Sequence, residues 1–264
     1  MPAKKNIGIP PEHLFLPFQD GIRGTGRFSV TLKASPLLAR MMETHELDAA
    51  FLSPMDYARG ASEYLIVPGA AVASRRGNSA VAIHFRKGTR DVRTLAVPAV
   101  SMSDIVLARV LLAEKFNLTP AIVPVAGTLD DMLKQADAAL LSGDEALRTG
   151  ENRPDALDLV EEWVTTTDLP YVHGFCVGRE DALEKDEWTV LGSSAAAMNG
   201  ASVSSLVEEA SSDPEKFSYD LDDDVRDGIR EFLQYAYYHG ILPDVPDLHF
   251  YGEKGGTPGD PELN

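Results

Sequence analysis

The stretch LDAAFLSPMDYARG, residues 47–60, decides the fold class. Its apolar run, Ala49 to Leu52, stops at Ser53-Pro54, and a helix-like segment follows. A short apolar run bounded by turn residues is typical of a buried strand, and serine followed by proline is typical of a helix start. The stretch therefore predicts a buried strand that leads directly into a helix, which is the repeating unit of an α/β fold.

The same order of strand and helix recurs on both sides of this stretch. FSVTLKA (28–34) gives way to a helix at Ser35-Pro36, and TLAVPAV (94–100) precedes the amphipathic segment SMSDIVLARVLLAEKFN (101–117). Strand signals fade after residue 190, where helical runs rich in Ala, Ser and Glu dominate. The chain is thus predicted to be an α/β protein with mainly parallel sheets and a helical C-terminal region.

Two predicted strands, residues 79–88 and 169–181, are candidates for crossings between two lobes. If the chain crosses there, residues 1–84 together with 176–264 form the first lobe, and residues 85–175 form the second. Two α/β lobes usually hold a ligand in the cleft between them, outside the carboxyl ends of the strands.

The formal net charge of −17 argues against nucleic acid or an anionic membrane as a partner, since both select basic surfaces. A small anionic ligand stays possible, because local donors in a cleft can hold a carboxylate. The N-terminus has no apolar run of a secretory signal, and no run is long enough to cross a bilayer. The single cysteine, Cys176, fits a reducing compartment, so a cytoplasmic location is expected.

Small polar residues follow three predicted strands, in Ser53-Pro54-Met55, Ser101-Met102-Ser103-Asp104 and Ser142-Gly143-Asp144. A junction of this kind points hydroxyls and free backbone N–H groups at whatever occupies the cleft. Simple helix capping is the alternative, since Ser and Asp favour N-caps in any protein. Ser101 and Ser103 are the strongest candidates for binding a carboxylate, whereas Asp104 could merely complement the helix dipole.

No metal or cofactor is expected. The six histidines show no spacing typical of metal ligands, and no phosphate-binding loop is complete. His173, in LPYVHGF on the predicted returning strand, borders the cleft and is a candidate for binding, although a buried core histidine is the alternative.

Three segments carry a resemblance to the menaquinone-biosynthesis family that includes chorismate dehydratase. They are SPLLARMMETHELDAAFLSPMDYARG (35–60), LLSGDEAL (140–147) and LDLVEEWVTTTDLPYV (157–172). The resemblance implies a two-lobed, type 2 periplasmic-binding-protein-like (Venus flytrap) fold in a cytoplasmic protein. It also implies a lyase that removes water from chorismate, a dicarboxylate, without metal or cofactor. Ser101 and Ser103, Ser53 and Met55, and Gly143 and Asp144 match the substrate-binding motifs of the family.

Two departures from the family pattern lie at its reacting centre. Leu14 occupies the position of an asparagine in the first strand–helix loop, and a leucine cannot donate a hydrogen bond. Ala80 replaces a serine, with Ser79 beside it. His13 or Glu12 could supply a polar group if the loop is reshaped, so His13 and Ser79 are the candidate catalytic residues.

Two functions therefore remain open. One is a dehydratase-like lyase of menaquinone (futalosine) biosynthesis that acts on chorismate or a related dicarboxylate. The other is a non-catalytic, cytoplasmic, small-carboxylate-binding protein on the same fold. The oligomeric state does not follow from the sequence.

Overall fold

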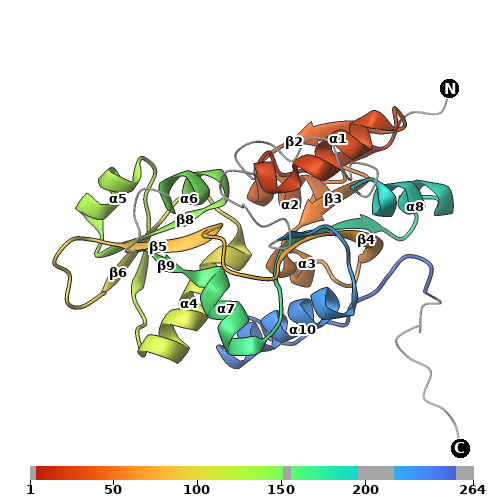
Figure 1. The fold of residues 1–264 in the computed structure, drawn as a ribbon. Coiled ribbons are helices and arrows are strands. Elements are labelled where there is room, and N and C mark those ends of the chain that lie inside the picture. The colour runs from red at the N-terminus through yellow and green to blue at the C-terminus, as the bar shows by residue number, and fades with distance from the viewer. Residues whose placement is uncertain (1–3, 151–155, 196–216, 254–264) are drawn as a thin grey trace, which may run out of the picture.

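Two separate β-sheets form the centres of two lobes in the computed structural model, which describes residues 4–150, 156–195 and 217–253 (Figure 1). The first sheet has six strands in the order β11-β4-β10-β3-β1-β2. In chain order these are β1 (Asn6–Ile9), β2 (Ser29–Leu32), β3 (Ala49–Leu52), β4 (Tyr64–Ser74), β10 (Tyr171–Arg179) and β11 (Phe217–Ser218).

The second sheet has five strands in the order β7-β6-β8-β5-β9. They are β5 (Val81–Phe85), β6 (Thr94–Val97), β7 (Ala121–Pro124), β8 (Ala138–Ser142) and β9 (Leu157–Asp158). The strands β1, β2 and β3 pair in parallel, as do β6, β7 and β8. The crossing strands β5 and β10 run antiparallel to their neighbours, and β4 and β11 run antiparallel to each other. The expectation of mainly parallel sheets therefore holds only within the groups β1–β3 and β6–β8.

The chain passes between the sheets at residues 75–80 and again at residues 168–170. Both passages contain a non-glycine residue in the left-handed region, Ser79 at φ 58° and Asp168 at φ 59°. The chain therefore changes from one sheet to the other several residues before the predicted lobe borders at 84/85 and 175/176. The reason is that β5 pairs with β8 in the second sheet, whereas β10 inserts between β3 and β4 in the first.

Helices cover both sheets. Around the first sheet lie η1 (His13–Phe15), α1 (Leu16–Gly24), α2 (Ser35–Glu43), α3 (Pro54–Arg59) and α8 (Lys185–Ser193). Around the second lie α4 (Met102–Phe116), α5 (Leu129–Gln135), α6 (Gly143–Gly150) and α7 (Leu159–Thr167). The helix α10 (Asp223–Tyr238) runs beneath both lobes and contacts β10, α3 and α4 (Figure 1). The helical runs expected at residues 196–216 lie outside the described residues.

One hydrophobic cluster continues from one lobe into the other. It joins Tyr57 of α3, Leu111 of α4, Trp163 of α7 and Phe232 of α10, which are all buried. Trp163 meets Phe232 edge to face at 5.7 Å between ring centroids. This packing fixes the two lobes together on the side of α3, α4 and α10. Cys176 is fully buried in β10.

Candidate functional site

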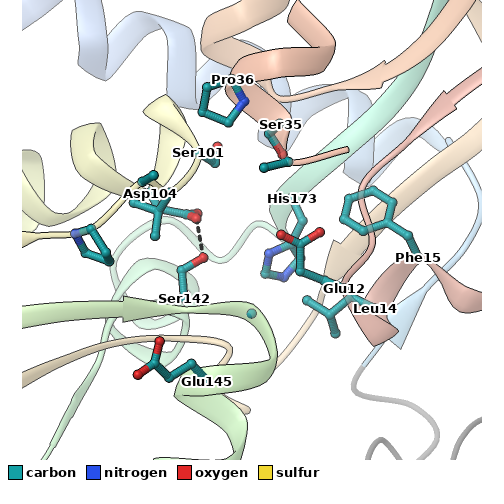
Figure 2. A pocket seen from close by; sticks show the side chains of 15 residues that line it. Glu12, Leu14, Phe15, Ser35, Pro36, Ser101, Asp104, Ser142, Glu145 and His173 are labelled. Carbon is teal, nitrogen blue, oxygen red and sulfur yellow. Dashed lines mark hydrogen bonds between the residues drawn. The ribbon is translucent and has the colours of Figure 1, made fainter. Parts of the chain in front are cut away.

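A cavity of about 180 Å³ lies between the two sheets, outside the carboxyl ends of β1, β2, β6 and β8 (Figure 2). From the first lobe it is lined by Glu12, Leu14, Phe15, Ala34, Ser35, Pro36 and His173. From the second lobe it is lined by Pro98, Ala99, Val100, Ser101, Asp104, Ser142, Gly143 and Glu145. Each lobe thus supplies about half of the wall.

Three helices begin at this wall. Ser35 opens α2, Ser101 is the N-cap of α4, and Gly143 opens α6. The N-terminus of a helix carries a partial positive charge and backbone N–H groups without helical partners. No lysine or arginine is among the described residues that line the cavity. An anion bound here would therefore be held by helix termini and hydroxyls.

Glu12 is a lining residue whose protonation is strongly affected by its surroundings. Its side chain is largely buried, and its Oε2 has no hydrogen-bond partner within the described part of the chain. Burial, together with the nearby carboxylates of Asp144 and Asp104, raises the pKa of Glu12 to about 7. Figure 2 shows its carboxyl group at the cavity, which His173 also lines. Glu12 can therefore gain or lose a proton near neutral pH.

Asp104 is a second buried carboxyl group at the wall. It accepts a hydrogen bond from the Ser142 hydroxyl at 2.6 Å and another from the Tyr171 hydroxyl at 2.7 Å. Burial raises the pKa of Asp104 to about 6, while the two hydroxyl bonds act in the opposite direction. Since Tyr171 belongs to β10 and Ser142 to β8, Asp104 links the two lobes and fixes the Ser142 hydroxyl at the cavity.

His173 lies on β10 and faces the same cavity (Figure 2). Its Nε2 is 2.7 Å from the Ser74 hydroxyl oxygen, and its ring meets Tyr171 edge to face at 5.0 Å. Burial lowers the pKa of His173 to about 3. The imidazole is therefore uncharged at neutral pH.

Three of the residues predicted from the sequence line the cavity, namely Ser101, Gly143 and His173. Ser53, Met55 and Ser103 do not, because the start of α3 packs against α4 instead of facing the cavity. Met55 donates its backbone N–H to the Ser103 hydroxyl at 3.0 Å, and the Ser53 hydroxyl caps α3. Met55 and Ser103 thus link the two lobes, whereas Ser53 stabilises the start of α3.

His13, Asp144 and Ser79 also lie outside the cavity wall. The backbone N–H of His13 donates to Asp144 Oδ1 at 2.9 Å, and His13 Nδ1 is 2.6 Å from Asp144 Oδ2. This pair joins η1 of one lobe to α6 of the other, immediately beside Glu12 and Gly143. Ser79 lies in the first crossing and donates its backbone N–H to Asp158 at 2.7 Å.

The sequence reasoning missed Ser35 and Glu145 as wall residues, and it gave less weight to Glu12 and Asp104 than to their neighbours. Ser35-Pro36 carried the same junction signal as Ser53-Pro54. Nothing in the sequence told which of the two junctions would face the cavity. Among the described residues, no group of three or more His, Cys, Asp or Glu side chains is arranged to hold a metal ion.

A family model described as menaquinone biosynthesis matches residues 6–238. The chain belongs to this menaquinone biosynthesis family. Membership gives it a role in that pathway and confirms the resemblance expected from the sequence. Within the described residues, no helix is long and apolar enough to cross a bilayer.

Solved structures with similar folds show what architecture this menaquinone biosynthesis protein has. A protein from Archaeoglobus fulgidus is 16% identical with a TM-score of 0.65, over 90% of this chain and 98% of its own. A Candida albicans protein is 13% identical with a TM-score of 0.62, over 92% of each chain, and is described as having the generic periplasmic binding protein fold. The alkanesulfonate-binding protein SsuA from Xanthomonas axonopodis pv. citri, bound to MOPS, is 13% identical with a TM-score of 0.57. The match covers 93% of this chain and 96% of SsuA. The predicted periplasmic-binding-protein fold is therefore confirmed.

Proposed function

We propose that this menaquinone biosynthesis protein is a dehydratase-type lyase, which eliminates water from chorismate or a related dicarboxylate. The observation that carries the proposal is Glu12, a largely buried carboxyl group with one unpartnered oxygen at the cavity and a pKa raised to about 7. A group that titrates near the working pH is well suited to general acid–base catalysis.

Elimination of water requires a base that removes a proton from carbon and an acid that protonates the departing hydroxyl. The electron pair of the C–H bond becomes the new C=C bond as the C–O bond breaks, and the proton and hydroxide together leave as water. We assign the proton transfers to Glu12. His173 and Ser142 lie at the same wall and would orient the leaving hydroxyl, because each is fixed by a hydrogen bond, to Ser74 and to Asp104 respectively.

The carboxylates of the substrate would be held by the helix termini at Ser35, Ser101 and Gly143. Three carboxyl groups share the wall with them: Glu12, Asp104 and Glu145. A bound dicarboxylate would disfavour a negative charge on Glu12, so we expect the ligand to bind together with a proton. The fold neighbour SsuA binds MOPS, which is an anionic sulfonate and supports a small anion as the ligand class here.

The test is incubation of the purified protein with chorismate, followed by chromatography of substrate and of 3-[(1-carboxyvinyl)oxy]benzoate. Glu12→Gln should lower kcat by about 10²–10⁴-fold, the usual contribution of a general acid–base group. Glu180→Gln removes an equal charge at an exposed position and is the control. No product from the wild-type protein, or full activity in Glu12→Gln, would overturn the proposal.

A non-catalytic carboxylate-binding protein is the second candidate, and Leu14 and Ala80 favour it. Both side chains are buried, with exposed fractions of 2% and 0%. The family pattern described above has polar side chains at these two positions. This candidate predicts that chorismate raises the melting temperature of the protein without being consumed. Leu14→Asn separates the two cases, because turnover that appears only in this variant would mark the wild-type chain as a binding protein.

We further propose a cytoplasmic location, which the single buried cysteine supports. Fractionation of the source cells with an antibody against the protein tests it, and recovery outside the cytoplasm would contradict it.

A further inference from the structure

A chain of three hydrogen-bonded side chains leads from the first crossing to the cavity. Asn78 lies in the crossing, Ser74 ends β4, and His173 faces the cavity from β10. Asn78 Nδ2 is 2.6 Å from Ser74 Oγ, and Ser74 Oγ is 2.7 Å from His173 Nε2. The donor and the acceptor of each of these hydrogen bonds can be assigned in turn, starting from Asn78.

Asn78 fixes the first direction. Its Oδ1 accepts the backbone N–H of Ala80 at 3.0 Å, so the amide can be oriented in only one way. The group that meets Ser74 is therefore the NH₂, which can donate but not accept. Ser74 Oγ is the acceptor of this bond.

Ser74 fixes the second direction. Its hydroxyl has a single proton, and its oxygen already accepts from Asn78. Ser74 is fully buried, so its proton must be used within the protein, and His173 Nε2 is the atom in reach. Nε2 is then an acceptor, and the proton of the neutral imidazole lies on Nδ1.

We infer that Ser74 and Asn78 are positioning residues that hold His173 in the Nδ1–H tautomer at the cavity. In this tautomer Nε2 is occupied by the Ser74 hydroxyl and Nδ1 carries a proton, so the ring has no free lone pair to take up another. His173 can therefore donate a hydrogen bond but cannot serve as the base, which leaves that role to Glu12. The catalytic meaning of the tautomer rests on the proposed function, whereas the tautomer itself does not.

The test is a long-range ¹H–¹⁵N correlation spectrum of the ¹⁵N-labelled full-length protein at neutral pH without substrate. The signals of His173 are assigned by their loss in His173→Gln. In the wild-type protein we expect the signature of a protonated Nδ1 and an unprotonated Nε2. A protonated Nε2, or protons on both nitrogens, would overturn the inference.

Asn78→Asp tests the role of the chain, because the introduced carboxylate accepts where the amide donated. The Ser74 proton should turn toward it, Ser74 Oγ should accept from the ring, and the two ¹⁵N signatures of His173 should exchange. Asn117→Asp makes the same chemical change at an exposed site on the other lobe and should leave them unchanged. If Asn78→Asp retains the wild-type tautomer, the positioning role is refuted.

Ser74→Ala provides a second variant should Asn78→Asp not fold. It removes the donor to Nε2, so we expect a mixture of tautomers in place of one, and a single wild-type tautomer would refute the inference. Turnover of chorismate is measured separately on the same samples. An exchanged tautomer with unchanged turnover would contradict the catalytic use of His173 while leaving the tautomer assignment intact.

Discussion

Glu12 is a carboxyl group that the folded protein keeps from ionising. Its pKa rises from 4.5 to about 7 on folding, so between these pH values the folded state binds more protons than the unfolded chain. The free energy of unfolding therefore falls as the pH rises through this window. A shift of this size corresponds to about 3 kcal/mol at pH values above the window.

Glu12→Gln should remove this pH dependence, because an amide does not titrate. We expect the free energy of unfolding of the variant, relative to the wild-type protein, to increase by up to about 3 kcal/mol between pH 4.5 and pH 8. Urea unfolding at a series of pH values measures it. Glu180→Gln should follow the wild-type curve, and a difference that stays constant with pH would show that Glu12 ionises normally.

The position of Glu12 at the cavity could not be predicted from the sequence because it depends on the direction of one loop. Pro10-Pro11 and the short helix η1 turn the chain so that Glu12 faces the cavity and His13 faces Asp144. Neighbouring residues point in different directions, and no periodic pattern fixes which of them points inward over so short a loop. The sequence predicted a catalytic residue in this loop and favoured His13, whereas Glu12 is the residue that lines the cavity.

At the scale of the elements, the strand–helix junctions were predictable and their surroundings were not. The serines at 53 and 101 do act as N-caps, as helix-start chemistry predicts. Only the second faces the cavity, because α3 lies against α4. Which junction faces a ligand depends on packing between segments far apart in the chain, and local sequence does not encode it.

Gly143 is the junction residue that tolerates change least. Its φ is +61°, and a Cβ added there would lie 2.9 Å from Cγ of Glu12. We expect Gly143→Ala to lower the free energy of unfolding by about 1–3 kcal/mol, from left-handed backbone strain and from displacement of Glu12. Turnover should fall as well, because the carboxyl group moves.

Gly24→Ala is the matched control for this substitution. Gly24 ends α1, its backbone is not left-handed, and a Cβ there would meet nothing within 4 Å. Its unfolding free energy should stay the same or rise by up to about 1 kcal/mol. Chemical unfolding and chorismate turnover are measured for both variants under the same conditions. Equal losses of stability in Gly143→Ala and Gly24→Ala would contradict the expected strain at Gly143.

At the scale of the whole molecule, the contacts between the lobes differ from one side of the cavity to the other. The Asp104–Tyr171 and Met55–Ser103 hydrogen bonds are buried and adjoin the shared hydrophobic cluster. The His13–Asp144 pair is partly exposed, with 34% and 22% of the two side chains accessible. The lobes should therefore separate at His13 and stay joined at α4.

His13→Ala should increase the radius of gyration of the ligand-free protein, which small-angle X-ray scattering measures. His239→Ala is the matched control, since it removes another histidine–carboxylate pair, to Glu114, where α10 packs on α4. That variant should keep the wild-type radius. An unchanged radius in His13→Ala would show that the His13 side chain does not hold the lobes together.

The two-lobed fold itself followed from the sequence, because alternating strands and helices with two candidate crossings leave few other architectures. The crossings were displaced by several residues in the prediction. Both β5 and β10 are largely apolar and buried, and a strand that is buried on both faces looks the same in either sheet. Their place is decided by the partners β8 and β3, which lie far away in the chain.

The strand order of the first sheet also constrains how the chain can fold during its synthesis on the ribosome. β4 is 11 residues long, and its strand partners, β10 and β11, both follow residue 170. The whole second sheet, which ends with β9 at Asp158, is translated in between. The nascent chain therefore carries its longest strand without a partner while the inserted lobe forms, and this is the interval in which unpaired strand edges promote aggregation. Chaperone capture should be strongest for ribosome-bound chains that end between β4 and β10.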